Sequence, residues 1–149
     1  MSTVADVLRD KGREVYSINA ENTVYEAIEQ MVACNVAALV VTDEQSELAG
    51  IISQRDFATK VVLCDKSPRA TKVKDVMTHD VLYVRDETPT STCMDIMSQK
   101  DFHHLPVVDR KKPVAVVTAG DLFKFVVSKQ SMAIEELEDY IFDEQGGEA

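Results

Sequence analysis

The chain has 149 residues, of which 45% are hydrophobic, so it can form one compact core or two small cores that support each other. Its formal net charge is −10, and residues 131–149 hold seven acidic residues without a Lys or Arg, which excludes a nucleic-acid polymer as the expected partner. No apolar run reaches the roughly 20 residues of a membrane span, and the N-terminus lacks a secretory signal, so we expect a cytoplasmic protein without membrane contact.

The first half of the chain predicts a short helix and then a β-α-β-β-α unit. Thr3 and Gly12 bound the short N-terminal helix. The unit that follows has expected strands at residues 14–18, 37–43 and 48–53 and expected helices at 23–35 and 55–63. Thr23 and Glu26 have the spacing of a capping box at the start of the first of these two helices.

The second half repeats the same order of elements after a polar, turn-rich connector at 64–80, in which one helical turn is expected. Strands are predicted at residues 81–84, 104–109 and 113–118, and helices at 90–100 and 120–127. Pro106 predicts an edge or an irregular start for its strand. An amphipathic acidic helix is expected at 131–142, and residues 143–149 are expected to fray.

An internal repeat organises these elements. A shift of 66 positions superposes Ile18 on Val84 and Val41 on Val107, and after a polar turn a shift of 65 superposes Asp56 on Asp121. We therefore predict an α/β (α+β) fold in which two repeats pack sheet to sheet about a pseudo-twofold axis, with added N-terminal and C-terminal helices. The expected units are a first repeat with the N-terminal helix at 1–64, a connector at 65–77, a second repeat at 78–130, and an acidic helix and tail at 131–149.

Each repeat ends its last strand with a hydroxyl residue followed three positions later by an aspartate. The pairs are Ser53 with Asp56 and Thr118 with Asp121. Both pairs have the spacing of a capping box, which explains them without a ligand. The alternative is a nucleotide site, in which the helix start and the hydroxyl bind a phosphate and the carboxylate accepts hydrogen bonds from a ribose diol.

The paired motifs "GIISQRD" and "AVVTAGD", with "HHLPVVD" and "VKDVMTHDVLYVRDETP", resemble a tandem pair of cystathionine-β-synthase (CBS) domains, a Bateman module. The resemblance extends over nearly the whole chain, and the opening "TVADVLRDKGREVYSI" and the acidic closing helix resemble those of small stand-alone proteins that consist of two such domains. It implies a regulatory module that binds AMP, ADP, ATP, NAD or S-adenosylmethionine, forms a homodimer and modulates a separate protein. It implies no required cofactor.

The resemblance also assigns expected roles to residues. It implies that Ser53 and Asp56 bind the ribose and phosphate of one nucleotide, and that Thr118 and Asp121 bind those of another. The residues expected to border the adenine are Tyr16, Ile18, Leu82, Val84 and Pro106.

Three further side chains are candidate phosphate ligands: Arg55, His103 and His104. The family more often has Arg-His before Leu-Pro, and here His103 replaces the arginine. A neutral histidine binds phosphate less strongly than arginine, so we expect weaker triphosphate binding and an affinity that rises at acidic pH. The first repeat has Ala37 and Ala38 at the corresponding positions, which predicts two unequal sites.

Two other functional classes compete with this interpretation. A structural dimerisation module that binds no nucleotide would use the same fold. An enzyme is not expected, because the sequence shows no nucleophile with a base, no phosphate-binding P-loop and no metal-ligand spacing among its three His and three Cys residues.

Overall fold

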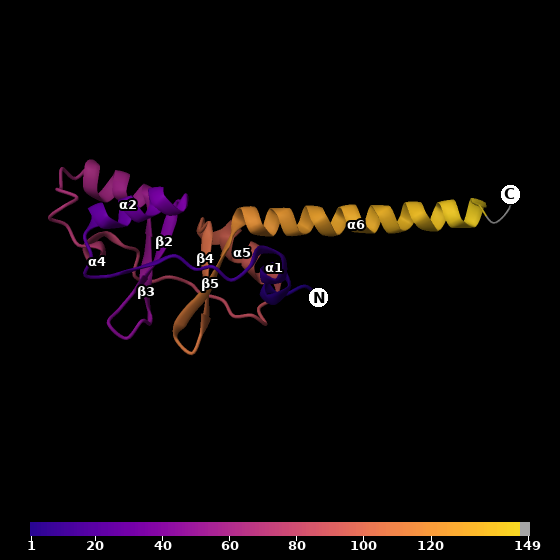
Figure 1. Ribbon diagram of the computed structural model, residues 1–149, viewed down its shortest axis with the longest axis horizontal. Coiled ribbons are helices and arrows are strands. Elements are labelled where there is room, and N and C mark those ends of the chain that lie inside the picture. Colours follow the sequence, from indigo (N-terminus) through magenta and orange to yellow (C-terminus); the bar gives the residue numbers. More distant parts are fainter. Residues whose placement is uncertain (147–149) are drawn as a thin grey trace.

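The computed structural model of the chain describes residues 1–146, and side chains as far as Ile141. Two small sheets lie next to each other, and a long helix extends from one side of them (Figure 1). None of the helices within the described residues is both long and apolar enough to cross a bilayer.

The first repeat forms a three-stranded sheet with the order β1-β2-β3. Strand β1 (Ser17–Asn19) pairs in parallel with β2 (Ala38–Thr42), which pairs antiparallel with β3 (Leu48–Ser53). Helix α2 (Val24–Cys34) connects β1 to β2 and begins at the predicted Thr23/Glu26 capping box. The short helix α3 (Gln54–Asp56) and the π-helix η1 (Phe57–Val62) follow β3, where the sequence predicts one helix.

The second repeat contains α5 (Thr90–Lys100), β4 (His104–Asp109), β5 (Lys112–Thr118) and the start of α6 (Ala119–Gly146). Its two-stranded sheet lies beside β2 and β3, and the backbone N–H of Leu48 donates to the Lys111 carbonyl at 3.0 Å (Figure 1). The predicted α/β fold of two packed β-α-β-β-α repeats is therefore confirmed, except that the first strand of the second repeat is reduced to a single bridge.

The predicted strand at 81–84 is wrong, because only Val84 forms a bridge, to Val107. In the first repeat the parallel pairing extends further, since the N–H of Val40 donates to the Tyr16 carbonyl at 3.2 Å. Pro106 occupies the position that corresponds to Val40 and has no N–H. The next hydrogen bond of the ladder, to Leu82, therefore cannot form, and Pro106 shortens the neighbouring strand rather than its own.

The segment that precedes each repeat packs on the other repeat. Helix α1 (Val4–Lys11) buries Val4, Val7 and Leu8 in the core of the second repeat. Helix α4 (Val73–Val76), the predicted turn in the connector, buries Val73 and Val76 in the core of the first. The N-terminal helix is thus next to the first repeat in sequence but contacts the second in space, so the chain crosses between the two cores.

Helix α6 is one continuous element where the sequence predicts two. No Gly or Pro lies between Val127 and Ser131, so the backbone has no reason to break there. The helix continues to Gly146, although fraying is predicted from residue 143, and residues 147–149 lie outside the described residues. Its first turns contact α1, α5 and β5, and the rest extends beyond the body (Figure 1).

At Gly50, strand β3 lies in close contact with the connector. A Cβ at Gly50 would overlap the backbone carbonyl of Thr78 and the Met77 side chain, whereas a Cβ at Gly120 would meet only ordinary contact with Thr118. We predict that Gly50→Ala lowers the free energy of unfolding by roughly 1–3 kcal/mol. Gly120→Ala in helix α6 is the matched control and should raise it by about 0.5–1 kcal/mol. Chemical denaturation measures both, and a stable Gly50→Ala protein would contradict the predicted overlap.

Candidate functional site

Two clefts lie between the repeats at corresponding positions. The first cleft has a volume of about 470 Å³ and lies beside the end of β3. Its lining brings together Ser53 and Asp56, which were predicted to bind one nucleotide, and the three candidate phosphate ligands Arg55, His103 and His104. Apolar contacts come from Ile51, Val81 and Phe102.

The second cleft has a volume of about 310 Å³ and lies beside the end of β5. Of the predicted residues it contains Tyr16, Thr118 and His104. Asn35 lines this cleft and Asp101 lines the first, and both end a helix in the left-handed conformation, with φ of 54° and 56°. The clefts are therefore built from equivalent turns, as the repeat predicts.

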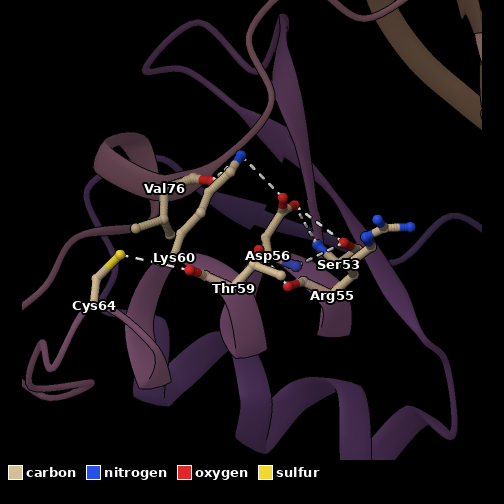
Figure 2. A network of polar contacts seen from close by, with 7 residues as sticks. All are labelled: Ser53, Arg55, Asp56, Thr59, Lys60, Cys64 and Val76. Carbon is tan, nitrogen blue, oxygen red and sulfur yellow. Dashed lines mark hydrogen bonds and ion pairs between the residues drawn. The ribbon is translucent and has the colours of Figure 1, made fainter.

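Asp56 is fixed by contacts on both carboxylate oxygens (Figure 2). Its Oδ2 accepts hydrogen bonds from the Ser53 backbone N–H at 3.0 Å and the Ser53 hydroxyl at 3.1 Å. Its Oδ1 lies 3.0 Å from Nζ of Lys60, which also donates to the Val76 carbonyl at 3.1 Å. The capping box predicted here is present, and the Arg55 side chain points away from this network (Figure 2).

Asp121 has the same capping contacts but a different cation. Its Oδ2 accepts from the Thr118 N–H at 2.8 Å, and its own N–H donates to the Thr118 hydroxyl at 3.1 Å. Lys11, at the end of α1, lies 2.6 Å from the same Oδ2 and donates to the Val116 carbonyl at 2.5 Å. Asp121 does not line the second cleft; it lines a neighbouring cavity, and Lys11 lines both.

Lys11 also controls the charge of Asp121. Burial raises the pKa of the Asp121 carboxyl, but hydrogen bonds from Lys11 and Thr118 and the charge of Lys11 outweigh burial, so the pKa lies below its ordinary value. Asp121 is therefore ionised and paired.

His104 lines both clefts and separates them. Burial lowers its pKa most, and the charges of His103 and Lys11 lower it further, against the opposing effect of Asp121. The lowered pKa means that His104 gains a proton only at a more acidic pH than an ordinary histidine.

The residues predicted to border adenine are not all placed at the clefts. Tyr16 lines the second cleft, whereas Ile18 and Val84 are 6% and 4% exposed and belong to the two cores. Leu82 lines a shallow surface depression, and Pro106 is buried in β4. Other apolar residues that line the clefts were not predicted from the sequence: Ile51, Val81 and Phe102 in the first, and Val36 in the second. Val36 and Phe102 correspond through the shift of 66, which is the signal that could have found them.

Comparison with known proteins identifies the family. A family model described as "CBS domain" matches residues 4–63 and 73–128. The chain belongs to the CBS domain family. The CBS domain-containing protein CBSX3, mitochondrial, of Arabidopsis thaliana is 34% identical over 98% of this chain and 73% of that protein.

Solved structures agree with this assignment. The CBS domain structure NE2398 has a TM-score of 0.80 and 35% identity, covering 85% of this chain and 98% of that one. The CBS domain pair of protein MJ0100, solved in complex with 5′-methylthioadenosine and S-adenosyl-L-methionine, has a TM-score of 0.74 and 25% identity, covering 84% of this chain and 99% of that one.

The contact between Lys11 and Asp121 predicts a change in titration. In Lys11→Met, which places at Lys11 an uncharged side chain of similar length, the Asp121 pKa should rise toward the ordinary value because its cation is lost. Lys11→Arg is the control and should keep the pKa low. Carboxyl-carbon NMR titration measures both, and an unchanged Asp121 pKa in Lys11→Met would show that Lys11 does not hold this carboxylate.

The lowered pKa of His104 predicts a pH dependence of stability. The unfolded chain takes up a proton near pH 6.5 while folded His104 resists it, so stability is present above that pH and falls as the pH drops toward the lowered folded value. His104→Gln should flatten this decline, and His79→Gln, at an exposed position, should not. Urea denaturation between pH 7.5 and 5 measures the effect, and equal pH profiles for the wild type and His104→Gln would contradict it.

Proposed function

We propose that the chain is a regulatory module that binds an adenosine-containing ligand in the first cleft and thereby modulates a separate protein. AMP, ADP, ATP, NAD and S-adenosylmethionine are the candidate ligands. The observation that carries the proposal is the first cleft itself, which collects Ser53, Asp56 and His103 around one opening beside apolar side chains. Its volume lies in the range of small-molecule sites.

Each part of a nucleotide has a chemical counterpart in this cleft. Ile51, Val81 and Phe102 offer apolar and aromatic surface to the adenine. Asp56 Oδ1 is held at the cleft and can accept hydrogen bonds from the ribose hydroxyls once Lys60 releases it. Arg55 provides a cation for phosphate, and the two histidines line the same cleft, where a ring N–H can donate to a phosphate oxygen. The Ser53 hydroxyl donates to Asp56 Oδ2 and can donate to phosphate instead once it leaves that oxygen.

The ligands of a relative support the chemical class. The MJ0100 domain pair was solved with 5′-methylthioadenosine and S-adenosyl-L-methionine, which share the adenosine group. In the first cleft, the apolar side chains suit an adenine, and Asp56 suits a ribose diol. The 5′ substituent is the variable part, and His104 makes the response to a phosphorylated ligand depend on pH.

The two clefts are proposed to be unequal, with the first as the stronger site. Lys11 lies between the second cleft and Asp121 and is bonded to that carboxylate, so a ligand must displace it to reach Asp121. The cation at Asp56 comes from Lys60 on the same helical segment, whose side chain is 44% exposed compared with 29% for Lys11. Lys60 can therefore move into solvent more easily.

Two parts of the proposal concern the context of the chain. Ligand binding modulates a partner only if the ligand prefers one arrangement of the repeats, or of two chains, over another. The cytoplasm stays the proposed location.

The competing function is a structural interaction module that binds no nucleotide. The complete capping boxes of Asp56 and Asp121 favour it, because they explain both aspartates without a ligand.

Calorimetry with the five candidate ligands and 5′-methylthioadenosine tests the proposal. We predict one site per chain, with an affinity that Asp56→Asn lowers about 10- to 100-fold, because a hydrogen bond to a charged group contributes about 1.5–3 kcal/mol. Asparagine keeps an oxygen that can accept from the Ser53 N–H, so the helix start is retained. Asp121→Asn is the matched control and should leave this first affinity unchanged.

The same measurement on Lys11→Ala tests the inequality of the clefts. Removal of the lysine exposes Asp121, so binding of uncharged 5′-methylthioadenosine should increase from one site per chain to two. Millimolar or absent binding of all ligands by the wild type would favour the structural module. A single site that Asp56→Asn leaves intact would contradict the assignment to the first cleft.

A further inference from the structure

Helix α6 carries an apolar stripe that no part of the described chain covers. The stripe consists of Phe123, Val127, Ile134, Leu137 and Ile141, which are 70%, 43%, 56%, 63% and 50% exposed. It lies about a third of a turn around the helix from Leu122 and Phe125, which face the second core. Phe123 and Val127 are thus exposed even where α6 contacts the body, so the stripe is not a docking face for the chain's own domain.

The spacing of the stripe is that of a coiled-coil seam. With Gln130 included, its positions are 123, 127, 130, 134, 137 and 141, which alternate steps of four and three residues. A lone helix in water is marginally stable, and most helices gain stability from packing an amphipathic face. The portion of α6 beyond the body has such a face and no partner within the described residues (Figure 1).

The charges around α6 favour a second copy of the same helix over a basic partner. Glu135, Glu136 and Asp139 lie on the side of the helix opposite the stripe, where they would not meet a molecule bound to the stripe. In the part of α6 that extends beyond the two repeats, the residues that flank the seam most closely are Ser131, Ala133 and Glu138. Two seams can therefore approach with little repulsion between like charges.

The direction of pairing follows from the charge distribution along α6. Lys124 and Lys129 lie near its start, and the acidic residues lie after residue 134. Among the charges that flank the seam, a parallel pair would bring the two copies of Glu138 to the same level along the helices, whereas an antiparallel pair brings each Glu138 close to Lys124 of the other chain. We propose that two chains associate through an antiparallel pair of α6 helices, in which Phe123 packs opposite Ile141 of the second copy and Val127 opposite its Leu137.

In this register each seam overlaps the other over its full length, about 27 Å at 1.5 Å per residue. Gln130 lies opposite Ile134 near the centre, and a single polar seam residue selects a register at a cost in stability. The Lys124 side chain of one copy comes next to Glu138 of the other, which gives two symmetric opposite-charge pairs. The proposal does not depend on nucleotide binding.

Sedimentation equilibrium of the full chain over micromolar to millimolar concentrations tests this interface. We expect association that Ile134→Glu weakens at least tenfold, since it places charges in the seam. Met132→Glu is the matched control, because Met132 is equally exposed at 58% but lies on the opposite side of α6, and it should leave association unchanged. Circular dichroism verifies that both variants keep the helix.

The charge pair tests the antiparallel register. Lys124→Glu and Glu138→Lys should each weaken association a few-fold, and the double variant should restore it because opposite charges again lie side by side. A wild-type chain that shows no association, or equal behaviour of Ile134→Glu and Met132→Glu, would overturn the interface. Failure of the double variant to restore association would overturn the antiparallel register.

Discussion

The hydrogen bond from a strand-end backbone N–H to an aspartate three residues later is the interaction on which the clefts depend. It is 3.0 Å between Ser53 and Asp56 and 2.8 Å between Thr118 and Asp121. The bond caps the helix that follows and fixes a carboxylate at the point where strand, helix and opposite repeat meet. Capping and ligand binding are therefore compatible roles of the same side chain, because the cap engages Oδ2 and leaves Oδ1 of Asp56 to an exchangeable lysine.

Crossed packing of α1 and α4 holds these carboxylates in relation to each other. Each helix precedes one repeat and packs in the core of the other, so neither core is complete without a segment from across the chain. The crossing also brings Lys11 from the end of α1 to Asp121, while Met77 follows α4 at the related place and supplies no charge. The same architecture that duplicates the cleft thus makes its two copies chemically different.

The fold can be predicted well from the sequence, because the helices and strands predicted in one repeat support those predicted in the other. Residues 90–93 are Thr, Ser, Thr and Cys, which favour a helix only weakly, but the corresponding segment at 23–35 has a clear helical pattern, and the structure confirms the helix at 90–100 as α5. A strand was predicted at 81–84, and only a single bridge at Val84 is present. The sequence pattern of 81–84 does not indicate this, because the cause is Pro106 in the neighbouring strand, which cannot donate a hydrogen bond. Ile18 and Val84 point to the cores, since apolar pattern alone does not separate a cleft wall from a core. The contact of Lys11 with Asp121 joins residues 110 positions apart, so no local motif could indicate it.

A crystal structure of the chain with AMP tests the central claim most directly. We expect adenosine in the first cleft, with a ribose hydroxyl within hydrogen-bond distance of Asp56 Oδ1 and Lys60 displaced from it. AMP bound elsewhere, or in the first cleft with the Asp56–Lys60 pair intact and the ribose turned away, would contradict this role of Asp56.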